Sequence, residues 1–226
     1  MPSRRILILF ALAFAGVAGS VAAQGAGAAP APFAARDFSA LVGTPGFSPA
    51  LLENHFKLYQ GYVKNAGALV EELDRLRKDG KERTPAFAES KRRFGWEFNG
   101  MRLHELFFEN LGGKAPLAEG SPLRKRLETD FGSFDEWLKD FRAACLMRGI
   151  GWCALVLDPV SGRLMNAWIN EHDGGVPAGC RILLILDVFE HAFLTDYGLD
   201  RAKYLEAALA AVKWEEVERR YGGGRP

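Results

Sequence analysis

The sequence is poor in the residues that mark a disulfide-stapled or zinc-bound domain. It has three cysteines, Cys145, Cys153 and Cys180, which are an odd number and show no Cys-x-x-Cys spacing. This pattern excludes a zinc knuckle and a paired redox motif. Cys145 falls in an expected helix and Cys153 in an expected strand, so one disulfide and buried free thiols both remain open. The chemistry must come from other residue types.

Long apolar runs are absent except near the start of the chain. The run Ile6 to Ala15 follows Arg4 and Arg5 and precedes the small residues Val21-Ala22-Ala23, an order typical of a secretory signal peptide. Because the run is too short to span a bilayer as a helix, we expect residues 1–23 to be removed. The mature chain would start near Gln24, be exported to the periplasm and keep no membrane segment.

Neither sign of charge dominates the chain. It has 29 basic and 28 acidic residues, and without residues 1–23 the numbers are 27 and 28. This balance argues against a nucleic-acid partner and against a charged membrane-binding surface. Residues 24–36 are rich in Ala, Gly and Pro, which indicates a flexible leader. About 190 residues remain, enough for one compact domain or two small ones that share an interface.

The first half of the mature chain predicts two long helices. Ser48-Pro49 supplies an N-cap and a first-turn proline before a helix from Ala50 to about Arg77. Thr84-Pro85 repeats this arrangement, and the second helix should run to Gly112-Gly113, where glycine can take a left-handed cap. We therefore expect residues 37–113 to form an antiparallel helical hairpin.

The second half, residues 114–226, has a different pattern. Ser133 to Glu136 forms a capping box that opens a helix ending at Gly149. Three apolar segments separated by turn residues predict strands, and an amphipathic closing helix should run from Asp200 through Tyr221. The expected strands are Trp152 to Leu157, Leu164 to Ile169 and Ile182 to Phe189. The fold class is therefore α+β, with a helical hairpin followed by an α/β domain.

Histidine is scarce, with four in the whole chain. Two of them, His55 and His104, fall in the expected long helices, and His191 stands four residues after Asp187 at the end of an apolar segment. Any one of them alone is more often a hydrogen-bonded core residue. Together they make a set of three nitrogen ligands and one oxygen ligand, which suits iron or manganese better than a structural zinc.

Several motifs resemble the iron/manganese superoxide dismutases in order and spacing, over roughly residues 40 to 221. They are Phe131-Gly132-Ser133-Phe134, Gly149-Ile150-Gly151-Trp152, Asp187-Val188-Phe189-Glu190-His191-Ala192, Asp196-Tyr197, and Tyr204-Leu205 with Val212-Lys213-Trp214-Glu215-Glu216-Val217. Five ordered motifs indicate the family far more strongly than any one of them. The resemblance implies a three-stranded antiparallel sheet in the second domain.

The resemblance places the family's four metal ligands on His55, His104, Asp187 and His191. It implies one iron or manganese ion per subunit and superoxide as the substrate, which is converted to oxygen and hydrogen peroxide. That reaction needs a metal that cycles between two oxidation states, which zinc does not do. The ligand set also leaves one coordination position for solvent.

The resemblance also implies residues around the metal. The family's solvent-binding glutamine is absent, because Gly100 occupies its helix position and His172 its loop position, so we expect His172 to bond to the metal's solvent. Trp152 should lie beside the centre. Tyr62 resembles the family's gateway tyrosine, but it follows His55 by seven positions instead of eight. One residue turns a helix by about 100°, so Tyr59 remains the alternative.

Three further positions bear on assembly and substrate entry. Glu190 matches a glutamate that reaches the partner subunit's last histidine ligand in the family, so we expect a homodimer. The family's interface tyrosine is Leu194 here. Arg201 matches an arginine near the substrate entrance, where a positive charge would attract a small anion.

Two other functions compete with an exported superoxide dismutase. One is a non-enzymatic metal-binding protein with the same fold, which the altered surroundings of the metal would permit. The other is a hydrolytic metalloenzyme, for which Glu171 would be the nearby carboxylate base. The complete ligand set and the presence of Glu190 favour the dismutase.

Overall fold

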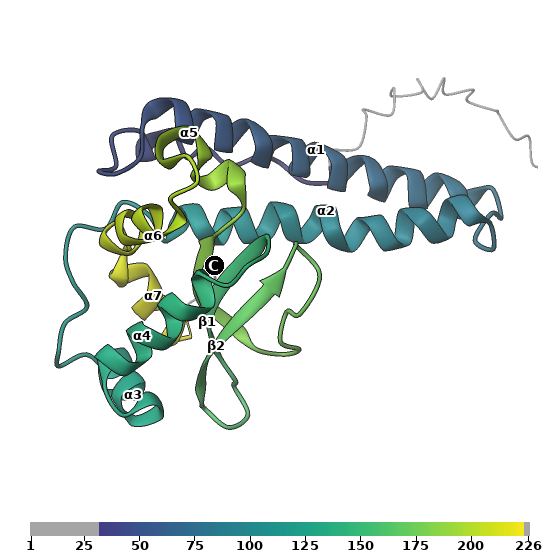
Figure 1. Ribbon diagram of the computed structural model, residues 1–226. Helices are drawn as coiled ribbons and strands as arrows, with labels where there is room; N and C mark the ends of the chain where they lie inside the picture. The colour runs from purple at the N-terminus through teal and green to yellow at the C-terminus, as the bar shows by residue number, and fades with distance from the viewer. Residues whose placement is uncertain (1–31, 224–226) are drawn as a thin grey trace, which may run out of the picture. The chain divides into compact units, whose positions relative to one another are not determined.

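The computed structural model describes residues 32–223, and its N-terminal part is a hairpin of two long helices. Helix α1 (Pro49–Lys78) and helix α2 (Pro85–Glu109) run antiparallel along each other (Figure 1). Ser48 Oγ accepts a hydrogen bond from the N–H of Leu51 at 3.1 Å, and Thr84 Oγ1 accepts one from Phe87 at 3.4 Å. Both expected N-caps are thus confirmed. The expected signal peptide lies outside the described residues.

Shorter helices occupy most of the second half. They are α3 (Pro122–Phe131), α4 (Phe134–Cys145), α5 (Leu194–Tyr197), α6 (Arg201–Ala210) and α7 (Trp214–Tyr221). Ser133 caps α4 as expected, since its hydroxyl accepts from the N–H of Glu136 at 3.1 Å. Helix α3 was not anticipated, although Ser121-Pro122 repeats the capping arrangement of α1 and α2.

A three-stranded antiparallel sheet forms the centre of the second half. Its strands are β1 (Gly151–Leu157), β2 (Leu164–Asn170) and β3 (Arg181–Asp187), in the order β2-β1-β3. All seven residues of β1 are buried, because this central strand is covered on both faces. The register pairs Trp152 with Asp187, which brings the first residues of β1 beside the last residue of β3.

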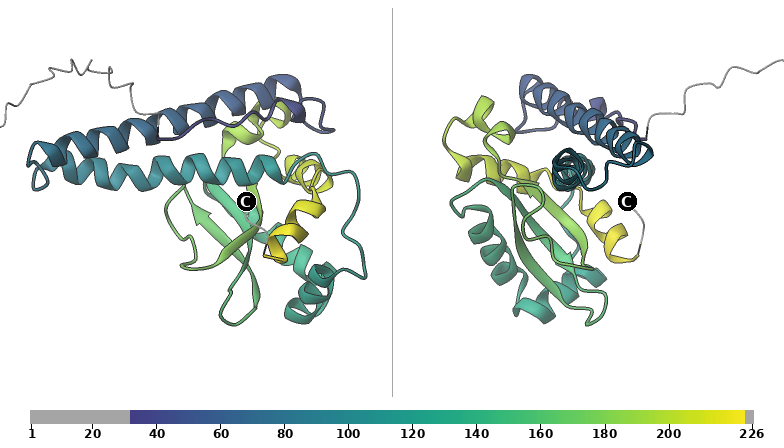
Figure 2. Two further views of the ribbon diagram at one scale, coloured as in Figure 1. Left: turned by 180° about the vertical axis from the view of Figure 1, so that it is seen from behind. Right: turned by 90° about the vertical axis from the view of Figure 1, so that its right-hand side faces the viewer.

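The sheet lies between two helical layers (Figure 2). Helix α4 packs on β1 and β2, while α2 and α7 pack on β3. The expected boundary between the two domains, after residue 113, falls in the loop that joins α2 to α3. The carboxyl end of β3 therefore approaches the hairpin, where a residue from each half can contribute to one site.

The expected closing helix from Asp200 to Tyr221 is wrong, because it is two helices, α6 and α7. The backbone between them pairs with the end of the hairpin: Lys213 N–H donates to the Asn110 carbonyl at 2.6 Å, and Gly113 N–H donates to the Ala211 carbonyl at 3.0 Å. A Cβ on Gly113 would lie 1.9 Å from the Val212 carbonyl oxygen. The two backbone segments approach this closely only because residue 113 is glycine.

Of the two states left open for the cysteines, the structure shows one disulfide, between Cys145 and Cys153, whose Cα atoms are 5.2 Å apart. It joins the last residue of α4 to the central strand β1. Both sulfur-bearing residues are fully buried, whereas Cys180 is a free, partly buried thiol.

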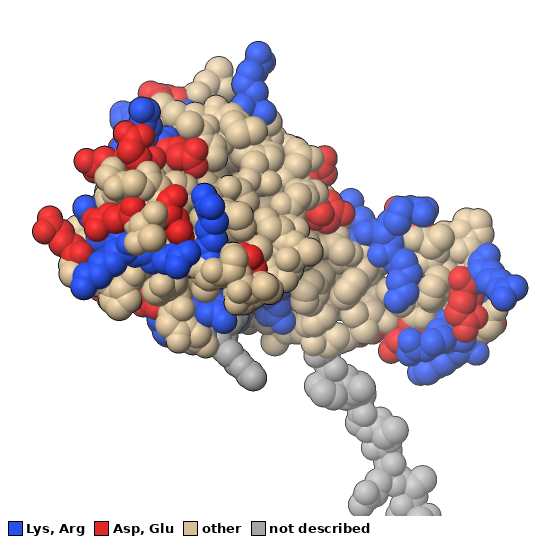
Figure 3. Space-filling view, turned by 90° about the horizontal axis from the view of Figure 1, so that it is seen from below, with Lys and Arg blue, Asp and Glu red and all other residues tan. Residues whose placement is uncertain are grey.

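The charged surface is mixed in sign. On the face in Figure 3, basic and acidic side chains gather over the α/β part and at the far end of the hairpin, with a mainly uncharged stretch between them. None of the helices within residues 32–223 combines the length and the apolar character needed to cross a membrane.

Candidate metal centre

Four side chains from three regions of the chain converge between the hairpin and the sheet. Their nitrogen and carboxylate ligand atoms all lie within 4.8 Å of one another. They are His55 of α1, His104 of α2, Asp187 at the end of β3 and His191 in a short 3-10 turn, Glu190–Ala192. Every one of the four residues predicted from the sequence is in the cluster.

The carboxylate lies at the centre of this cluster. Asp187 Oδ2 is 3.2 Å from His55 Nε2, 3.5 Å from His104 Nε2 and 3.0 Å from His191 Nε2. Its other oxygen accepts the N–H of Phe189 at 2.9 Å, and its backbone carbonyl accepts the hydroxyl of Tyr204 at 2.7 Å. These bonds orient Oδ2 towards the three imidazoles.

His104 shows that these residues suit a metal ion. Its Nδ1 lies 2.5 Å from the Gly100 carbonyl and must donate to it, so the neutral ring presents the lone pair of Nε2 to the cluster. Nε2 is buried and has no hydrogen-bond partner among the described residues. A buried acceptor of this kind is costly unless something binds it. A cation at the centre of the four ligand atoms would satisfy it.

Burial also keeps the helix histidines in the form that binds metals. Burial lowers the pKa of His55, and it lowers the pKa of His104 well below its ordinary value, with a further contribution from the neighbouring His55. Both imidazoles are therefore neutral near pH 7. Metal ligands must be deprotonated, so no proton has to leave these two rings before a cation binds.

Next to the ligands, three side chains form a hydrogen-bonded chain. Trp152 Nε1 is 3.1 Å from His172 Nδ1, and His172 Nε2 is 2.8 Å from the hydroxyl of Tyr62. Trp152 and His172 are fully buried, and Tyr62 is 8 % exposed. The ring of Tyr62 lies 5.1 Å from that of His104, between ring centroids. The three predicted neighbours of the centre are thus linked, with His172 in contact with both of the others.

The tautomer of His172 follows from this chain. An indole N–H can only donate, so His172 Nδ1 must be the acceptor and the ring hydrogen lies on Nε2. Burial lowers the pKa of His172 to about 4, so the ring is neutral near pH 7. Nε2–H then donates to the Tyr62 oxygen, and the hydroxyl hydrogen of Tyr62 can donate onward. A direct bond from His172 to bound solvent stays a prediction.

Tyr62, and not Tyr59, faces the centre. Helix α1 is regular throughout, so the shorter spacing from His55 reflects the absence of a local bulge. Tyr59 instead donates its hydroxyl to Glu105 at 2.8 Å and packs on Phe108. Burial, together with the charge of Asp187, raises the pKa of Tyr62. Its hydroxyl therefore stays protonated near pH 7.

Phenylalanines complete the walls of the centre. Phe189 stacks on His172 at 4.9 Å and on His191 at 5.1 Å, and Phe108 lies 5.0 Å from His55, all between ring centroids. These rings carry no hydrogen-bonding group. Trp152, in contrast, donates a hydrogen bond to His172.

Glu190 and Arg201 lie farther out. Glu190 is exposed, next to His191, which is the one ligand with a partly exposed side chain, at 29 %. Arg201 begins α6 and donates to the carbonyls of Met147 and Gly149 at 2.7 and 2.8 Å. It therefore holds the loop between α4 and β1, and its role in substrate entry stays a prediction.

Trp96 lies beside His172 and was not predicted from the sequence. The ring centroids of Trp96 and His172 are 4.5 Å apart, and the indole N–H donates to Glu171 at 3.1 Å. A signal was present, because Trp96, Gly100 and His104 are spaced by four along one helix. Residues at that spacing share a helix face.

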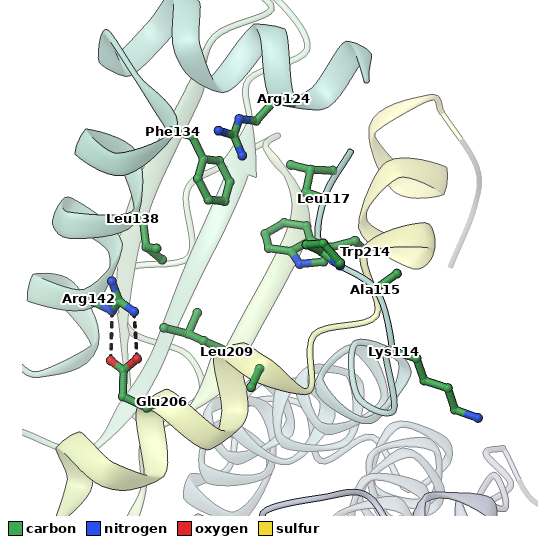
Figure 4. A pocket seen from close by; sticks show the side chains of 12 residues that line it. Lys114, Ala115, Leu117, Arg124, Phe134, Leu138, Arg142, Glu206, Leu209 and Trp214 are labelled. Carbon is green, nitrogen blue, oxygen red and sulfur yellow. Dashed lines mark hydrogen bonds and ion pairs between the residues drawn. The ribbon is translucent and has the colours of Figure 1, made fainter. Parts of the chain in front are cut away.

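A separate hollow of about 460 Å³ lies between α3, α4, α6 and α7 (Figure 4). None of the four ligands lines it. Its two arginines have partners within the chain: Arg142 forms a two-pronged ion pair with Glu206, and Arg124 lies 3.8 Å above the Phe134 ring. The hollow is not part of the metal centre.

Comparison with known proteins identifies the cluster. Residues 119–220 match the family of iron/manganese superoxide dismutases, C-terminal domain. The chain is 34 % identical over 195 residues to a superoxide dismutase [Fe] of Pyrobaculum aerophilum, covering 84 % of this chain and 89 % of that protein. It is 37 % identical over 171 residues to superoxide dismutase [Mn] 2 of Haloferax volcanii, covering 74 % and 83 %.

A superoxide dismutase [Fe] of Methanothermobacter marburgensis is similar to a comparable degree, at 35 % identity over 172 residues, covering 74 % of this chain and 84 % of that protein. Relatives named for either metal therefore match about equally well. The matches span most of the chain, and they include proteins whose length it largely covers. This chain belongs to the iron/manganese superoxide dismutase family.

Proposed function

We propose that this protein is an exported superoxide dismutase that acts as a homodimer and takes protons from Tyr62, which His172 holds in position. The dismutase function itself follows from the family and from the His55, His104, Asp187 and His191 cluster, which is the observation that carries it. Metal analysis of the purified protein, combined with a superoxide-decay assay, tests it. The named relatives favour the enzyme over a non-enzymatic metal-binding protein.

The four ligands suit iron or manganese, which supplies the one-electron redox chemistry when it is bound. The protein must supply the rest. Two superoxide anions and two protons give one oxygen molecule and one hydrogen peroxide molecule, so each full cycle consumes two protons. A buried centre cannot take those protons directly from bulk water, and a relay of side chains has to deliver them.

Tyr62, oriented by His172, has the chemistry to deliver a proton. Because Trp152 occupies His172 Nδ1, the Nε2–H of His172 points to the Tyr62 oxygen, and the Tyr62 hydroxyl keeps its own hydrogen to give away. When Tyr62 gives up its hydroxyl proton, the hydrogen on His172 Nε2 stays on His172 and stabilises the tyrosine oxygen until Tyr62 regains a proton from solvent. Trp152 prevents the opposite tautomer and so keeps His172 as the hydrogen-bond donor to Tyr62.

His172→Gln is expected to keep the metal bound and to change the reduction potential and the dismutation rate. An amide can accept from Trp152 with its oxygen and donate to Tyr62 with its nitrogen, but its N–H is a weaker acid than the imidazole N–H and stabilises the Tyr62 oxygen less. We expect a potential shift of roughly 60 mV or more, since about 59 mV corresponds to a tenfold change for one electron. Redox titration and pulse radiolysis measure the two quantities. Unchanged values for both would show that His172 only fills space.

The homodimer proposal is supported by the exposed side of the centre. His191 is partly exposed, Glu190 beside it is exposed, and Leu194 in the following helix is 50 % exposed. Ligand histidines usually have a carboxylate or carbonyl on their second nitrogen. A two-fold axis here would let each Glu190 reach the partner's His191, which gives two such contacts per dimer.

Glu190→Ala is expected to weaken the dimer and reduce metal retention together. Truncating one partner of a buried charged hydrogen bond typically costs about 2–5 kcal/mol. Sedimentation at several concentrations, with metal content measured on the same samples, tests this. Glu89→Ala is the control, because Glu89 is exposed and pairs with Arg92 on its own helix. A wild-type protein that is monomeric yet active and fully metallated would contradict the proposal.

Export is supported by two separate observations. Residues 1–23 have the order of a signal peptide. The Cys145–Cys153 disulfide is a bond that persists in oxidising compartments such as the periplasm. N-terminal sequencing of the mature protein tests the expected start near Gln24.

A further inference from the structure

The turn that carries His172 has an unusual backbone. Asn170 N–H donates to the Gly174 carbonyl at 2.6 Å, and Gly174 N–H donates back at 3.1 Å, which closes residues 170–174 into a tight loop. Glu171 has φ of 51°, the one positive value among the described residues other than glycine. A residue with a long side chain avoids this conformation unless its surroundings hold it there.

Helix α2 supplies contacts that hold this turn. Trp96 Nε1 donates to Glu171 Oε2 at 3.1 Å, and Asn99 Nδ2 donates to the His172 carbonyl at 3.0 Å. The turn is also attached to the segment just before β1, because Glu171 N–H donates to the Ile150 carbonyl at 3.3 Å. The contact between Trp96 and Glu171 joins side chains 75 positions apart.

Trp96 is itself well placed to act as an anchor. The Arg93 guanidinium lies 4.0 Å above its ring, and Arg93 forms an ion pair with the buried Glu97 at 2.6 Å. The other neighbours of the indole are Tyr62, at 5.5 Å between ring centroids, and His172, at 4.5 Å. The indole therefore covers both Tyr62 and His172 while its N–H bonds to the turn.

We propose that Trp96 and Glu171 are positioning residues, whose hydrogen bond holds the 170–174 turn against α2 so that His172 Nε2 stays on the Tyr62 hydroxyl. The turn would otherwise relax towards an ordinary backbone conformation at Glu171. His172 would then move, and both of its ring hydrogen bonds depend on its position. The role in catalysis rests on the dismutase function, whereas the role in holding His172 does not.

The first test removes the indole N–H of Trp96 and keeps an aromatic ring over His172. Trp96→Phe retains a ring over His172 but cannot bond to Glu171. In the full-length protein loaded with zinc, which is diamagnetic, nitrogen-15 NMR of the four histidines reports which ring nitrogen of His172 carries hydrogen. We expect wild type to show the Nε2–H form alone, and Trp96→Phe to lose that signal to a mixture of tautomers.

A second set of variants separates the hydrogen bond from general packing. Glu171→Ala removes the acceptor and should lose the Nε2–H signal as Trp96→Phe does, whereas Glu171→Gln keeps an acceptor oxygen and should retain the signal. Trp168→Phe is the matched control, because it makes the same change at a partly buried tryptophan on β2. It should behave as wild type.

The same proteins loaded with iron or manganese are then compared for reduction potential and dismutation rate. Trp96→Phe and Glu171→Ala should shift both in the same direction, with metal content unchanged. Retention of the His172 signal in both variants would overturn the proposal, and so would its loss in Glu171→Gln or Trp168→Phe. An inactive wild-type protein would contradict the dismutase function and leave the NMR result as the test of positioning. If Trp96→Phe does not fold, the comparison of Glu171→Ala with Glu171→Gln decides the question, because Glu171 is exposed.

Discussion

His104→Ala protein is expected to purify without stoichiometric iron or manganese. His104 Nε2 is buried and has no other partner among the described residues, so its lone pair contributes fully to the bound ion. Loss of an outer hydrogen-bond partner of a ligand already costs 10- to 100-fold in metal affinity. We therefore expect removal of the ligand itself to cost more than about 100-fold. Dismutase activity should fall below detection together with the metal.

The same result is expected for His55→Ala, Asp187→Ala and His191→Ala, because each removes one protein ligand in four. Asp187→Ala should be the most severe, since Asp187 Oδ2 contacts all three imidazoles. Metal content by mass spectrometry and superoxide decay are measured on the same preparations. His172→Gln serves as the control for loss of a buried histidine that is not a ligand. Full occupancy in any of the four ligand variants would remove that residue from the centre.

Gly100→Ala is expected to damage the proton relay and leave the ligands in place. A Cβ on Gly100 would lie 2.6 Å from Cδ1 of Tyr62. The Tyr62 ring has little room to move, because Trp96, His104 and His172 surround it. Overpacking of this kind costs about 1–3 kcal/mol. If the hydroxyl moves by about 1 Å, the dismutation rate can fall by roughly a hundredfold.

Gly95→Ala is the matched control for that variant. Gly95 lies on the same helix, and a Cβ there would meet nothing within 4 Å. Because alanine is the better helix former, we expect Gly95→Ala to raise the free energy of unfolding by about 0.5–1 kcal/mol without changing the rate. Chemical denaturation and superoxide decay measure the two effects. A Gly100→Ala protein with the wild-type rate and stability would show that the contact with Tyr62 is unimportant.

Local physical chemistry explains why much of the fold could be predicted from the sequence. The N-caps Ser48, Thr84 and Ser133 satisfy backbone N–H groups of their own helices, so a short window of sequence contains the whole interaction. The strands were recognisable because apolar segments alternate with turn residues. The four ligands were identified from the scarcity of histidine and from the ordered family motifs.

The errors and omissions involve contacts between separate elements of the fold. The break between α6 and α7 depends on backbone hydrogen bonds from Gly113 and Lys213 to partners roughly a hundred positions away. The pairing of Cys145 with Cys153 depends on how α4 packs on β1. Neither feature can be seen in a local pattern. The isolated 200–221 segment could equally well form one helix, and isolated cysteines could equally well stay as free thiols.

The sequence by itself determined the ligand set, the helical hairpin, the three-stranded sheet and the family, since these depend on residue type and spacing along the chain. Only the tertiary structure decided that Tyr62 and not Tyr59 faces the centre, that Trp152 sets the tautomer of His172, and that Trp96 holds the turn beside it. Each of these depends on the direction of a hydrogen bond between separate elements. Such directions exist only after β1, α2 and the 170–174 turn have packed together, because packing brings donor and acceptor within reach of each other.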